Sequence, residues 1–420
     1  MFRVFKAKWI LPADDKVIKD GFLILENGKI FDIVEGTDIR KQNIFNNASE
    51  IVDYGNAVIT PGFINLHTHL QYTDLKKNQK EQNFPEWIKS LMLQYFLWSK
   101  KKKINSVLNG VKEAILSGTT CVAQLSGEPE FLETFNKLDL KTYIFLETFA
   151  NTEESSETEF KKLIQKYNYI DQNKNENVFV GFSPHSVYTV HPFLWKKIVE
   201  LSAKNDILIH THLAESNAEM EWLKNGHSEI DALYKLIRWN PLIPYKTGLN
   251  PVEYLKEFGV LNENLIAAHM IQLDKSLMEE IFSYGVKLAY CPRSNMLLHG
   301  KTIDISEYKE YTDSIGIGTD SKYSNYDLSI LNEVKFVKFS SNLDLFQLLN
   351  MLTINAAKIL KIDDKTGSLK KGRYADFLVF RLNNNESYLN LFDKNKPDDV
   401  YIKGKPVVKD YKLIKSDVFK

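Results

Sequence analysis

From about residue 62 to about residue 365, short strand-like runs alternate with longer amphipathic helical stretches. The strand-like runs include TTCVAQL, KTYIFLETF, VFVGFSPH, DILIHTHLAE, LIAAHM, VKLAYCP and SIGIGTD, and the helical stretches include FLWKKIVELSAK and SLMEEIFSYG. This alternation favours a parallel sheet, because each helix returns the chain to the start of the next strand. The number and spacing of the runs fit a closed (β/α)8 barrel better than an open, doubly wound sheet.

The two ends of the chain have a different pattern. Near the N-terminus the strand-like runs FRVFKAKWI, GFLILENGKIFDIV and EIVDYGNAVITPGFINLH are separated by Gly, Asn and Asp turns. After about residue 366, short strands return in GSLKKGRYADFLVF and DDVYIKGKPVVKDYKLI without helices between them. Both patterns are typical of antiparallel sheets. We therefore expect an α/β protein with a (β/α)8 TIM barrel over residues 58–365 and a small composite β-sandwich subdomain built from residues 1–57 and 366–420.

The charge balance of the chain indicates which class of partner it binds. Lys plus Arg and Asp plus Glu are equal at 54 each, so no basic field would attract nucleic acid or a membrane surface. A small molecule is the expected partner.

The two cysteines, Cys121 and Cys291, indicate neither a disulfide framework nor a cysteine metal cluster. Charged residues interrupt the apolar N-terminus, and no uncharged apolar stretch is long enough to span a bilayer, so we expect a cytoplasmic protein.

Two histidines end the first strand-like run of the expected barrel. His67 and His69 are two residues apart on an extended chain, so both side chains point the same way and can bind one metal ion. A single His-x-His pair can equally be solvent-facing or hydrogen-bonded. A third histidine, His212, ends the run in DILIHTHLAES, and Glu215 follows in the next loop. His210 lies deeper in that strand, and we expect it to be packed or to support the ligands.

Later strand-like runs also end in groups that can bind metal or transfer protons. His269 ends the run in LIAAHMIQL, and Asp320 ends the run in SIGIGTDSKYSN. In a (β/α)8 barrel the carboxyl ends of the strands meet at one mouth, where active sites are built. The sequence therefore predicts that these residues converge on one site.

The segments PGFINLHTHL, HTHLAES, AAHMIQL and IGTDSKYSN resemble the amidohydrolase superfamily, in particular its mononuclear nucleobase-deaminase branch. The resemblance extends to the closing GSLKKGRYADFLVF and so covers nearly the whole chain. It implies four metal ligands: His67, His69, His212 and Asp320. It also implies that Glu215 is the proton shuttle and that His269 lies beside the bound water. Because no lysine stands at a strand end where a carboxylated bridging ligand would be needed, we expect one divalent metal ion, and the resemblance implies zinc or iron(II).

The resemblance implies that this site catalyses hydrolytic deamination. A divalent cation with three imidazoles and one carboxylate lowers the pKa of bound water, which supplies hydroxide near neutral pH. Asp320 can accept the water proton as hydroxide attacks an aromatic C–NH₂ carbon, and Glu215 can protonate the adjacent ring nitrogen. His269 can stabilise the developing alkoxide. The H-x-E and P-C-x-x-C signature of the His/Cys zinc deaminases is missing, so the chemistry would be convergent.

Candidate substrate contacts are indicated by sequence patterns that are less specific than those of the metal ligands. In GFSPHSVYTV, His185 stands near a strand end, where the resembling purine deaminases place a substrate-contacting histidine; a plain loop histidine is the alternative. In FPEWIKSL, Glu86 can bind ribose hydroxyls and Trp87 can cover a base, although a first helical turn with Trp87 in the core fits equally well. The further candidates follow a barrel strand in CPRSN: Arg293, Ser294 and Asn295.

The segments HLAESNAEMEWLKNGHSEIDAL, CPRSNMLLHGKTIDI and HTHLQYTDL are most similar to the aminodeoxyfutalosine deaminases of the futalosine route to menaquinone. Those enzymes convert 6-amino-6-deoxyfutalosine to futalosine. That substrate carries a benzoate, whose carboxylate an arginine such as Arg293 could bind. Arg238 in LIRWN is better explained as a surface arginine. Gln71 departs from the acidic residue expected after the His-x-His pair, which weakens the substrate assignment.

Three alternatives stay open. The first is a deaminase for adenosine, 5′-methylthioadenosine or S-adenosylhomocysteine. The second is a chlorohydrolase or amidase acting on an s-triazine or a cyclic amide. The third is a non-catalytic nucleoside binder or scaffold, against which the carboxylates of Glu215 and Asp320 argue. The resemblance also suggests a homodimer.

Overall fold

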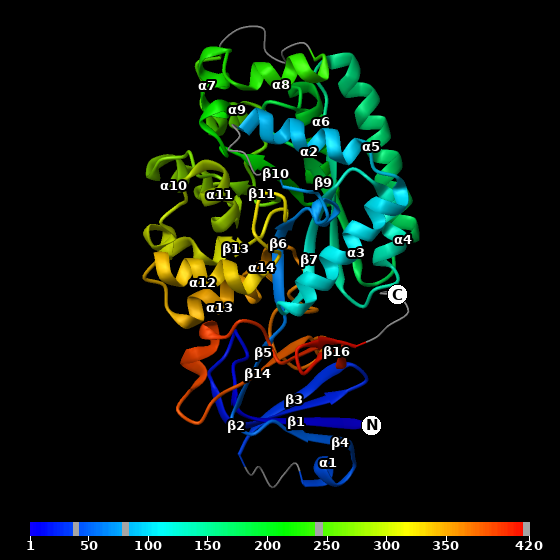
Figure 1. The fold of residues 1–420 in the computed structure, drawn as a ribbon, viewed down its shortest axis with the longest axis vertical. Helices are drawn as coiled ribbons and strands as arrows, with labels where there is room; N and C mark the ends of the chain where they lie inside the picture. The colour runs from blue at the N-terminus through cyan, green and yellow to red at the C-terminus, as the bar shows by residue number, and fades with distance from the viewer. Residues whose placement is uncertain (37–41, 78–83, 240–246, 415–420) are drawn as a thin grey trace.

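The computed structural model describes residues 1–36, 42–77, 84–239 and 247–414. A helix-wrapped barrel occupies one end of the molecule and a β-sheet layer the other, with both chain ends contributing strands to the sheet (Figure 1). The polypeptide passes from the sheet into the barrel at β5 and β6 and returns to the sheet at β14.

Eight parallel strands build the barrel within the described ranges. They are β6 (Phe63–Thr68), β7 (Thr119–Ser126), β8 (Lys141–Thr148), β9 (Val178–Pro184), β10 (Ile209–Leu213), β11 (Leu265–His269), β12 (Lys287–Tyr290) and β13 (Ile315–Ile317). They are hydrogen-bonded in chain order from β6 to β13. A parallel bridge joins Thr68 to Asp320, and the Asp320 backbone N–H donates to the carbonyl of His67 at 3.0 Å. The barrel is thus nearly closed, and the predicted (β/α)8 fold is confirmed.

The strands form because their residues are apolar on both faces. In β7 and β8 every residue is buried. Alternate residues such as Ala123, Leu125 and Phe145 fill the barrel interior, while their neighbours pack outward against the helices. Continuous burial is what a parallel strand covered by helices requires.

Helices surround the barrel. They are α2 (Phe84–Phe96), α3 (Lys100–Leu116), α4 (Leu132–Phe135), α5 (Glu153–Asn173), α6 (Pro192–Asn205), α7 (Asn217–Asn225), α8 (Ile230–Ile237), α9 (Pro251–Glu257), α10 (Lys275–Ser283), α11 (Pro292–His299), α12 (Ile330–Ser340), α13 (Leu345–Leu352) and α14 (Ile354–Ile359). Each of the two helical stretches singled out in the sequence forms a helix, α6 and α10. In α6 the residues Leu194, Trp195 and Ile198 form the buried stripe that faces the sheet. Short 3₁₀ turns connect other elements: η2 (Leu70–Tyr72), η3 (Pro129–Phe131), η4 (Ile305–Ser314) and η5 (Tyr388–Asp393).

The second layer is a nine-stranded sheet of the described residues that combines both ends of the chain. Its N-terminal strands are β1 (Phe2–Ile10), β2 (Ile18–Glu26), β3 (Lys29–Glu35), β4 (Ala48–Asp53) and β5 (Ala57–Pro61), with α1 (Gln42–Asn46) beside them. Its C-terminal strands are β14 (Phe377–Arg381), β15 (Asp399–Ile402), β16 (Lys405–Lys409) and β17 (Lys412–Leu413). Strand β5 lies between β1 and β14, which joins the two halves. The composite β subdomain is therefore confirmed, and we retain the boundaries 1–57, 58–365 and 366–420 as a proposal.

A buried ion pair connects the barrel floor to this sheet. Lys141 begins β8, and its ammonium donates to the carboxylate of Asp376, just before β14; both side chains are 1% exposed. Asp376 also accepts from the Thr366 hydroxyl at 2.8 Å and from the Lys403 backbone N–H at 2.9 Å. The Lys141 ammonium lies 4.6 Å from the centroid of the Tyr374 ring. Both charges of this pair have partners inside the protein.

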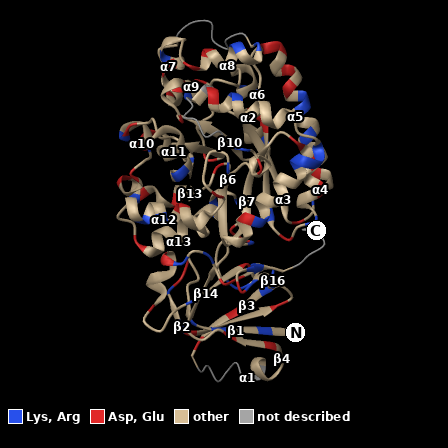
Figure 2. Cartoon of the chain, viewed as in Figure 1, with Lys and Arg blue, Asp and Glu red and all other residues tan. Residues whose placement is uncertain are grey.

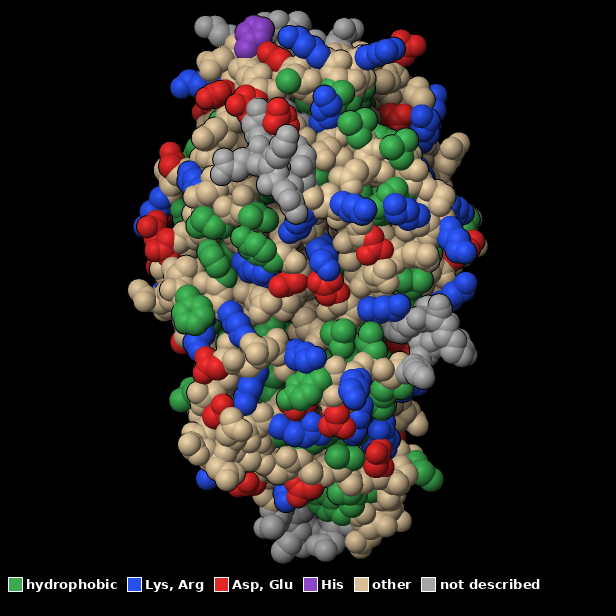
Figure 3. Space-filling model, viewed as in Figure 1, with side chains coloured by type: hydrophobic (Ala, Val, Ile, Leu, Met, Phe, Trp, Pro, Cys, Tyr) green, Lys and Arg blue, Asp and Glu red, His purple; other side chains and the backbone are tan. Residues whose placement is uncertain are grey.

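The surface agrees with the balanced charge. Lys and Arg side chains alternate with Asp and Glu over the helices and the sheet (Figure 2), and the face drawn in Figure 3 shows no large field of one sign. Within the described ranges no helix combines the length and the apolar character needed to cross a bilayer. Cys121 and Cys291 are buried and unlinked.

Candidate metal centre

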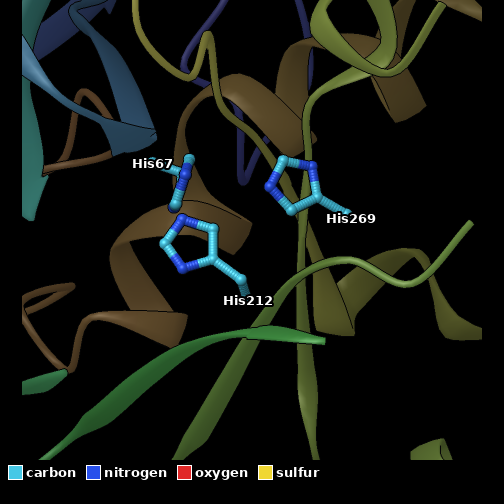
Figure 4. A group of neighbouring side chains, drawn as sticks. All are labelled: His67, His212 and His269. Carbon is cyan, nitrogen blue, oxygen red and sulfur yellow. The ribbon is translucent and has the colours of Figure 1, made fainter. Parts of the chain in front are cut away.

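Three histidines and one aspartate meet at the mouth of the barrel. His67 and His69 come from the end of β6, His212 from β10, and Asp320 from the loop after β13. The Asp320 Oδ1 lies 3.5 Å from His67 Nε2 and 3.6 Å from His69 Nε2. His69 Nε2 lies 3.3 Å from His212 Nε2. Figure 4 shows the rings of His67 and His212 close together, with His269 facing the same space.

These distances suit a single small cation. Ligands bound at about 2.0–2.1 Å around a tetrahedral zinc ion lie about 3.4 Å from one another, which is close to the three observed separations. The Nε2 atom of His67 is buried and has no hydrogen-bond partner among the described residues. An orphaned imidazole nitrogen beside a carboxylate oxygen costs free energy unless a ligand binds it. The residues therefore fit the divalent cation that the sequence implied.

Other side chains fix the orientation of the candidate ligands. His212 Nδ1 donates to the carbonyl of His185 at 3.0 Å, which leaves Nε2 free to face His69. The second Asp320 oxygen, Oδ2, accepts from the hydroxyls of Ser294 at 2.7 Å and Ser324 at 2.6 Å, so Oδ1 is left for the metal. Below them, His210 is fully buried, and its Nε2 lies 3.2 Å from the Leu66 carbonyl and 3.4 Å from His67 Nδ1. Such outer contacts set the tautomer and basicity of ligands.

The protonation states also suit metal binding. Burial lowers the pKa of His67 well below its ordinary value, lowers that of His69 to about 4, and lowers that of His212 as well. For Asp320 burial alone would raise the pKa, but the neighbouring imidazoles, that of His67 most of all, outweigh it and hold the pKa well below the usual range. The imidazoles are thus neutral and the carboxylate is ionised, which is the state in which they bind a cation.

Backbone conformation at two strand ends is unusual. His269 has φ of +72° and Asp320 has φ of +56°, although neither residue is glycine. Left-handed conformations in non-glycine residues cost free energy, and they persist where the surrounding structure imposes them. Both residues turn their side chains into the mouth at the point where the strand ends.

Glu215 and His269 form a second pair beside the candidate ligands. His269 Nδ1 donates to the amide oxygen of Asn295 at 2.7 Å, so its Nε2 faces Glu215 at 3.8 Å. The other neighbour of the Glu215 carboxylate is His299, whose Nε2 lies 3.2 Å away. Burial opposes ionisation of Glu215, but the charge of His269 and the hydrogen bond from His299 more than offset it and lower the pKa to about 2. Glu215 is therefore an ionised group that can accept a proton.

The turn that carries Glu215 is itself held in place. The carboxylate of Glu219 accepts the backbone N–H of Ala214 at 2.8 Å and of Glu215 at 3.0 Å. Gln272 donates from its side-chain amide to the Glu215 carbonyl at 3.3 Å. Ala214 has φ of +48°, so these contacts hold a strained turn after β10.

The predicted substrate contacts are placed as follows. His185 is half-buried beside His212, with ring centroids 4.6 Å apart. Trp87, on α2, packs between Phe84 and Tyr323, whose centroids lie 6.0 and 5.4 Å away. Glu86 is exposed on the first turn of α2.

Three further predicted contacts in the first turns of α11 are already bonded to protein groups: Arg293, Ser294 and Asn295. The guanidinium of Arg293 is paired with Asp327 at 2.8 Å and with Glu333 at 3.3 Å, while Ser294 and Asn295 bond to Asp320 and His269 as described above. Contacts of these three with a substrate stay a prediction. Arg238 is exposed at the end of α8.

Gln71, the residue that departs from the expected acidic pattern, has a structural setting. It is buried in η2, donates to the Leu125 carbonyl at 2.9 Å and accepts from the side-chain amide of Gln124. Both halves of its amide are thus used within the protein.

Two residues at the mouth were missed from the sequence. Glu147 is the penultimate residue of β8, is 8% exposed, and has a carboxylate oxygen within 4.8 Å of ring nitrogens of His185 and His212. The strand-end rule that identified His269 would also have identified Glu147 at the end of KTYIFLETF. His299 lies in the last turn of α11, where no sequence pattern predicted its contact with Glu215.

Comparison with known proteins gives the class. The sequence model of the amidohydrolase family matches residues 58–407. The chain is 26% identical, over 96% of its length and 93% of the relative, to a 5-methylthioadenosine/S-adenosylhomocysteine deaminase of Halothermothrix orenii.

Two solved structures have the same fold. An adenosine deaminase from Xanthomonas campestris with bound zinc is 21% identical and superposes with a TM-score of 0.83, covering 99% of this chain and 94% of that one. The aminofutalosine deaminase of Helicobacter pylori in complex with methylthio-coformycin is 20% identical and has a TM-score of 0.84, covering 97% of this chain and 100% of that one.

The chain therefore belongs to the amidohydrolase family, and it is a hydrolase that acts on carbon–nitrogen bonds.

Proposed function

We propose that this protein hydrolytically deaminates an adenine nucleoside and releases ammonia. The observation that carries the proposal is the pairing of two sets of groups at one mouth: four converging ligand atoms and, beside them, the Glu215–His269 pair. A protein that only bound nucleosides would not need a second buried carboxylate at this position. The similarity to nucleoside deaminases supports the same class of substrate.

One divalent cation would be held by the Nε2 atoms of three histidines and by one carboxylate: His67, His69, His212 and Asp320. When bound, such a cation supplies a hydroxide nucleophile near neutral pH by lowering the pKa of a water molecule. The donor set accepts zinc and iron(II) alike. The zinc in the similar adenosine deaminase favours zinc for the first trials.

The residues of the chain would then move the protons. Asp320 accepts the proton of the attacking water as that water adds to the carbon bearing the amino group. Glu215, ionised at rest, takes up the other proton of that water and delivers it to the adjacent ring nitrogen, and it then helps to pass the proton held by Asp320 to the departing ammonia. His269, oriented by Asn295, hydrogen-bonds the oxygen that gains charge during the addition.

We propose that aromatic side chains of α2 cover the base. Phe84 and Trp87 stack on each other, and the Phe84 ring lies 5.3 Å from the ring of His299, the partner of Glu215. Aromatic rings so close to the proton-transfer pair can pack on a purine and limit the access of water. Trp87 therefore remains our candidate for contact with the base.

Within this class we propose 6-amino-6-deoxyfutalosine as the substrate, because HLAESNAEMEWLKNGHSEIDAL and CPRSNMLLHGKTIDI resemble the deaminases of that nucleoside. The product would be futalosine, in the route to menaquinone. The second candidate is 5′-methylthioadenosine or S-adenosylhomocysteine, favoured by the similarity over nearly the full length of the Halothermothrix orenii relative.

A panel of substrates, assayed with protein of known metal content, tests both the proposed reaction and the proposed substrate. The purified chain, loaded with zinc or with iron(II), is incubated with 6-amino-6-deoxyfutalosine, adenosine, 5′-methylthioadenosine, S-adenosylhomocysteine and atrazine, and release of ammonia and chloride is measured. We expect ammonia from at least one adenine nucleoside and most rapidly from aminodeoxyfutalosine. Chloride from atrazine with no ammonia from any nucleoside would contradict the proposed function, and a faster rate with another nucleoside would contradict only the substrate.

A further inference from the structure

We propose that the end of α2 and the start of α3 form a surface that binds reversibly to an anionic lipid membrane. The surface, the α2–α3 patch, has an apolar part and a cationic part. The apolar part is Leu93, Phe96 and Leu97, and the cationic part is Lys100, Lys101 and Lys102. The patch lies on the outside of the barrel, so the inference does not depend on the proposed function.

The C-terminal end of α2 is apolar on two sides. Its inner side packs on the protein, because Leu91 and Tyr95 are 9% and 7% exposed and belong to one buried cluster. On its outer side Leu93 is 54% exposed and Phe96 is 72% exposed, and Leu97, which follows the helix, is 86% exposed. A helix on the surface of a globular protein normally has a polar outer side. Neighbouring exposed apolar side chains therefore indicate a contact surface.

The lysines that follow have no acidic partner among the described residues. Lys100, Lys101 and Lys102 form the first turn of α3, which contains no acidic residue. The next residue, Lys103, does have one, because its ammonium lies 3.2 Å from the Glu128 carboxylate. Cations in the first turn of a helix oppose its macrodipole, so the three lysines do not stabilise α3. Their charges are left for an anion outside the protein.

The two parts of the patch are adjacent. The end of α2 leads directly into α3 at the side of the barrel (Figure 1). Between them lies the half-buried Trp98, whose ring is 4.2 Å from the Lys102 ammonium and has its centroid 6.0 Å from that of Tyr95. Tryptophan and lysine at the level of the headgroups, with Phe and Leu inserted below them, is the arrangement of membrane-surface anchors.

A second copy of this chain fits the patch less well. A two-fold contact would place the patch against itself, so the lysines of both copies would face each other and repel. An anionic bilayer neutralises the same charges and accepts the apolar side chains. The whole chain has as many acidic as basic residues, so the attraction is confined to the patch and binding is reversible.

Flotation of the full chain with lipid vesicles tests the inference. We expect the protein to float with vesicles of phosphatidylcholine mixed with phosphatidylglycerol, less with phosphatidylcholine alone, and less as sodium chloride is added. Lys100→Gln/Lys101→Gln/Lys102→Gln should lower the partition coefficient on the anionic vesicles about 100-fold, at about fivefold for each lysine. Phe96→Ser/Leu97→Ser should lower it by about 10-fold or more, because less apolar surface is buried.

Two control variants carry matched changes elsewhere on the surface. Lys204→Gln/Lys370→Gln/Lys371→Gln removes the same charge at exposed positions, and Phe339→Ser removes a phenylalanine that is 86% exposed. Both should bind anionic vesicles as the wild type does. All four variants should have the melting temperature of the wild type, since the altered side chains lie on the surface.

No binding of the wild type to anionic vesicles, equal binding to both kinds of vesicle, or binding that salt does not weaken would overturn the inference without any variant. Equal losses in the patch variants and their controls would also overturn it. Sedimentation velocity examines the other occupant. A wild-type dimer that the apolar double variant dissociates would assign the patch to self-association and overturn the lipid surface.

Discussion

Both ends of the barrel bury charged side chains, but they treat them differently. At the floor, Lys141 and Asp376 satisfy each other, and Thr366 and the Lys403 backbone complete the set. At the mouth, the Nε2 atoms of His67 and His269 have no hydrogen-bond partner among the described residues. The partnered charges at the floor stabilise the fold, whereas the unpartnered imidazole nitrogens at the mouth are available to a ligand. The contrast predicts that mutations at the two ends will have opposite consequences for activity and stability.

The largest effect is expected at the mouth. Glu215→Gln keeps the shape of the side chain but removes the proton acceptor, so kcat should fall by about 10²- to 10⁴-fold. Zinc content and thermal stability should stay at wild-type levels, because Glu215 is not among the four ligands. Steady-state ammonia release and elemental analysis of the same preparation measure both. Retention of more than about a tenth of the wild-type kcat would contradict the role of Glu215 as the proton shuttle.

The opposite result is expected at the floor. Lys141→Met leaves a buried carboxylate without its cation, so the free energy of unfolding should fall by about 3–5 kcal/mol, while kcat of the folded protein is unchanged. The double variant with Asp376→Asn should recover much of the loss, because its amide oxygen still accepts from the Lys403 backbone and its amide nitrogen can donate to the Thr366 hydroxyl. Denaturant titrations measure both. A loss of kcat without a loss of stability would mean that the two ends do not divide function and fold in this way.

A smaller effect is expected when a side chain that orients a metal ligand is removed. Ser324→Ala removes one of the two hydroxyl donors to Asp320 Oδ2, so the dissociation constant for zinc should rise about 10- to 100-fold. Competition with a chelator measures it, with Ser340→Ala on the exposed end of α12 as the control. An unchanged dissociation constant would show that Asp320 needs no such support or is not a ligand.

Replacement of His299, which contacts the Glu215 carboxylate, should have the smallest effect on the rate. His299→Leu removes a hydrogen bond to the carboxylate, so kcat should fall about 10-fold, and His299→Gln should restore part of it. Because His299 helps to lower the pKa of Glu215, its loss should raise that pKa. Activity that needs ionised Glu215 is lost as pH falls through this pKa, so the acid limb of the kcat profile should move to higher pH. A profile that does not move would remove His299 from the proton pathway.

Most of the fold could be predicted because its signal is local. Runs such as DILIHTHLAE are buried on both faces, and the helical stretches between them have one apolar stripe, so each segment indicates its own structure. The strand ends then place His67, His212, His269 and Asp320 at one mouth, since all parallel strands end on the same side. The pairing of β5 with both β1 and β14 has no such local signal, but the short strands at both ends of the chain sufficed to predict one composite layer.

The rest of the site depends on contacts between distant segments. His299 lies on a helix and approaches Glu215 only because α11 crosses the mouth, and the roles of Ser294 and Asn295 as supports of Asp320 and His269 depend on the same helix. The engagement of Arg293 by Asp327 and Glu333 is equally long-range. Glu147 is different, because its place at a strand end made it predictable in principle.

The most direct measurement is the ammonia release of metal-free protein titrated with zinc. The account predicts that metal-free protein is inactive, that ammonia release from the best nucleoside of the panel rises linearly, and that it is complete at one zinc per chain. Full activity without a divalent cation, or activity that requires two per chain, would contradict a site built from His67, His69, His212 and Asp320.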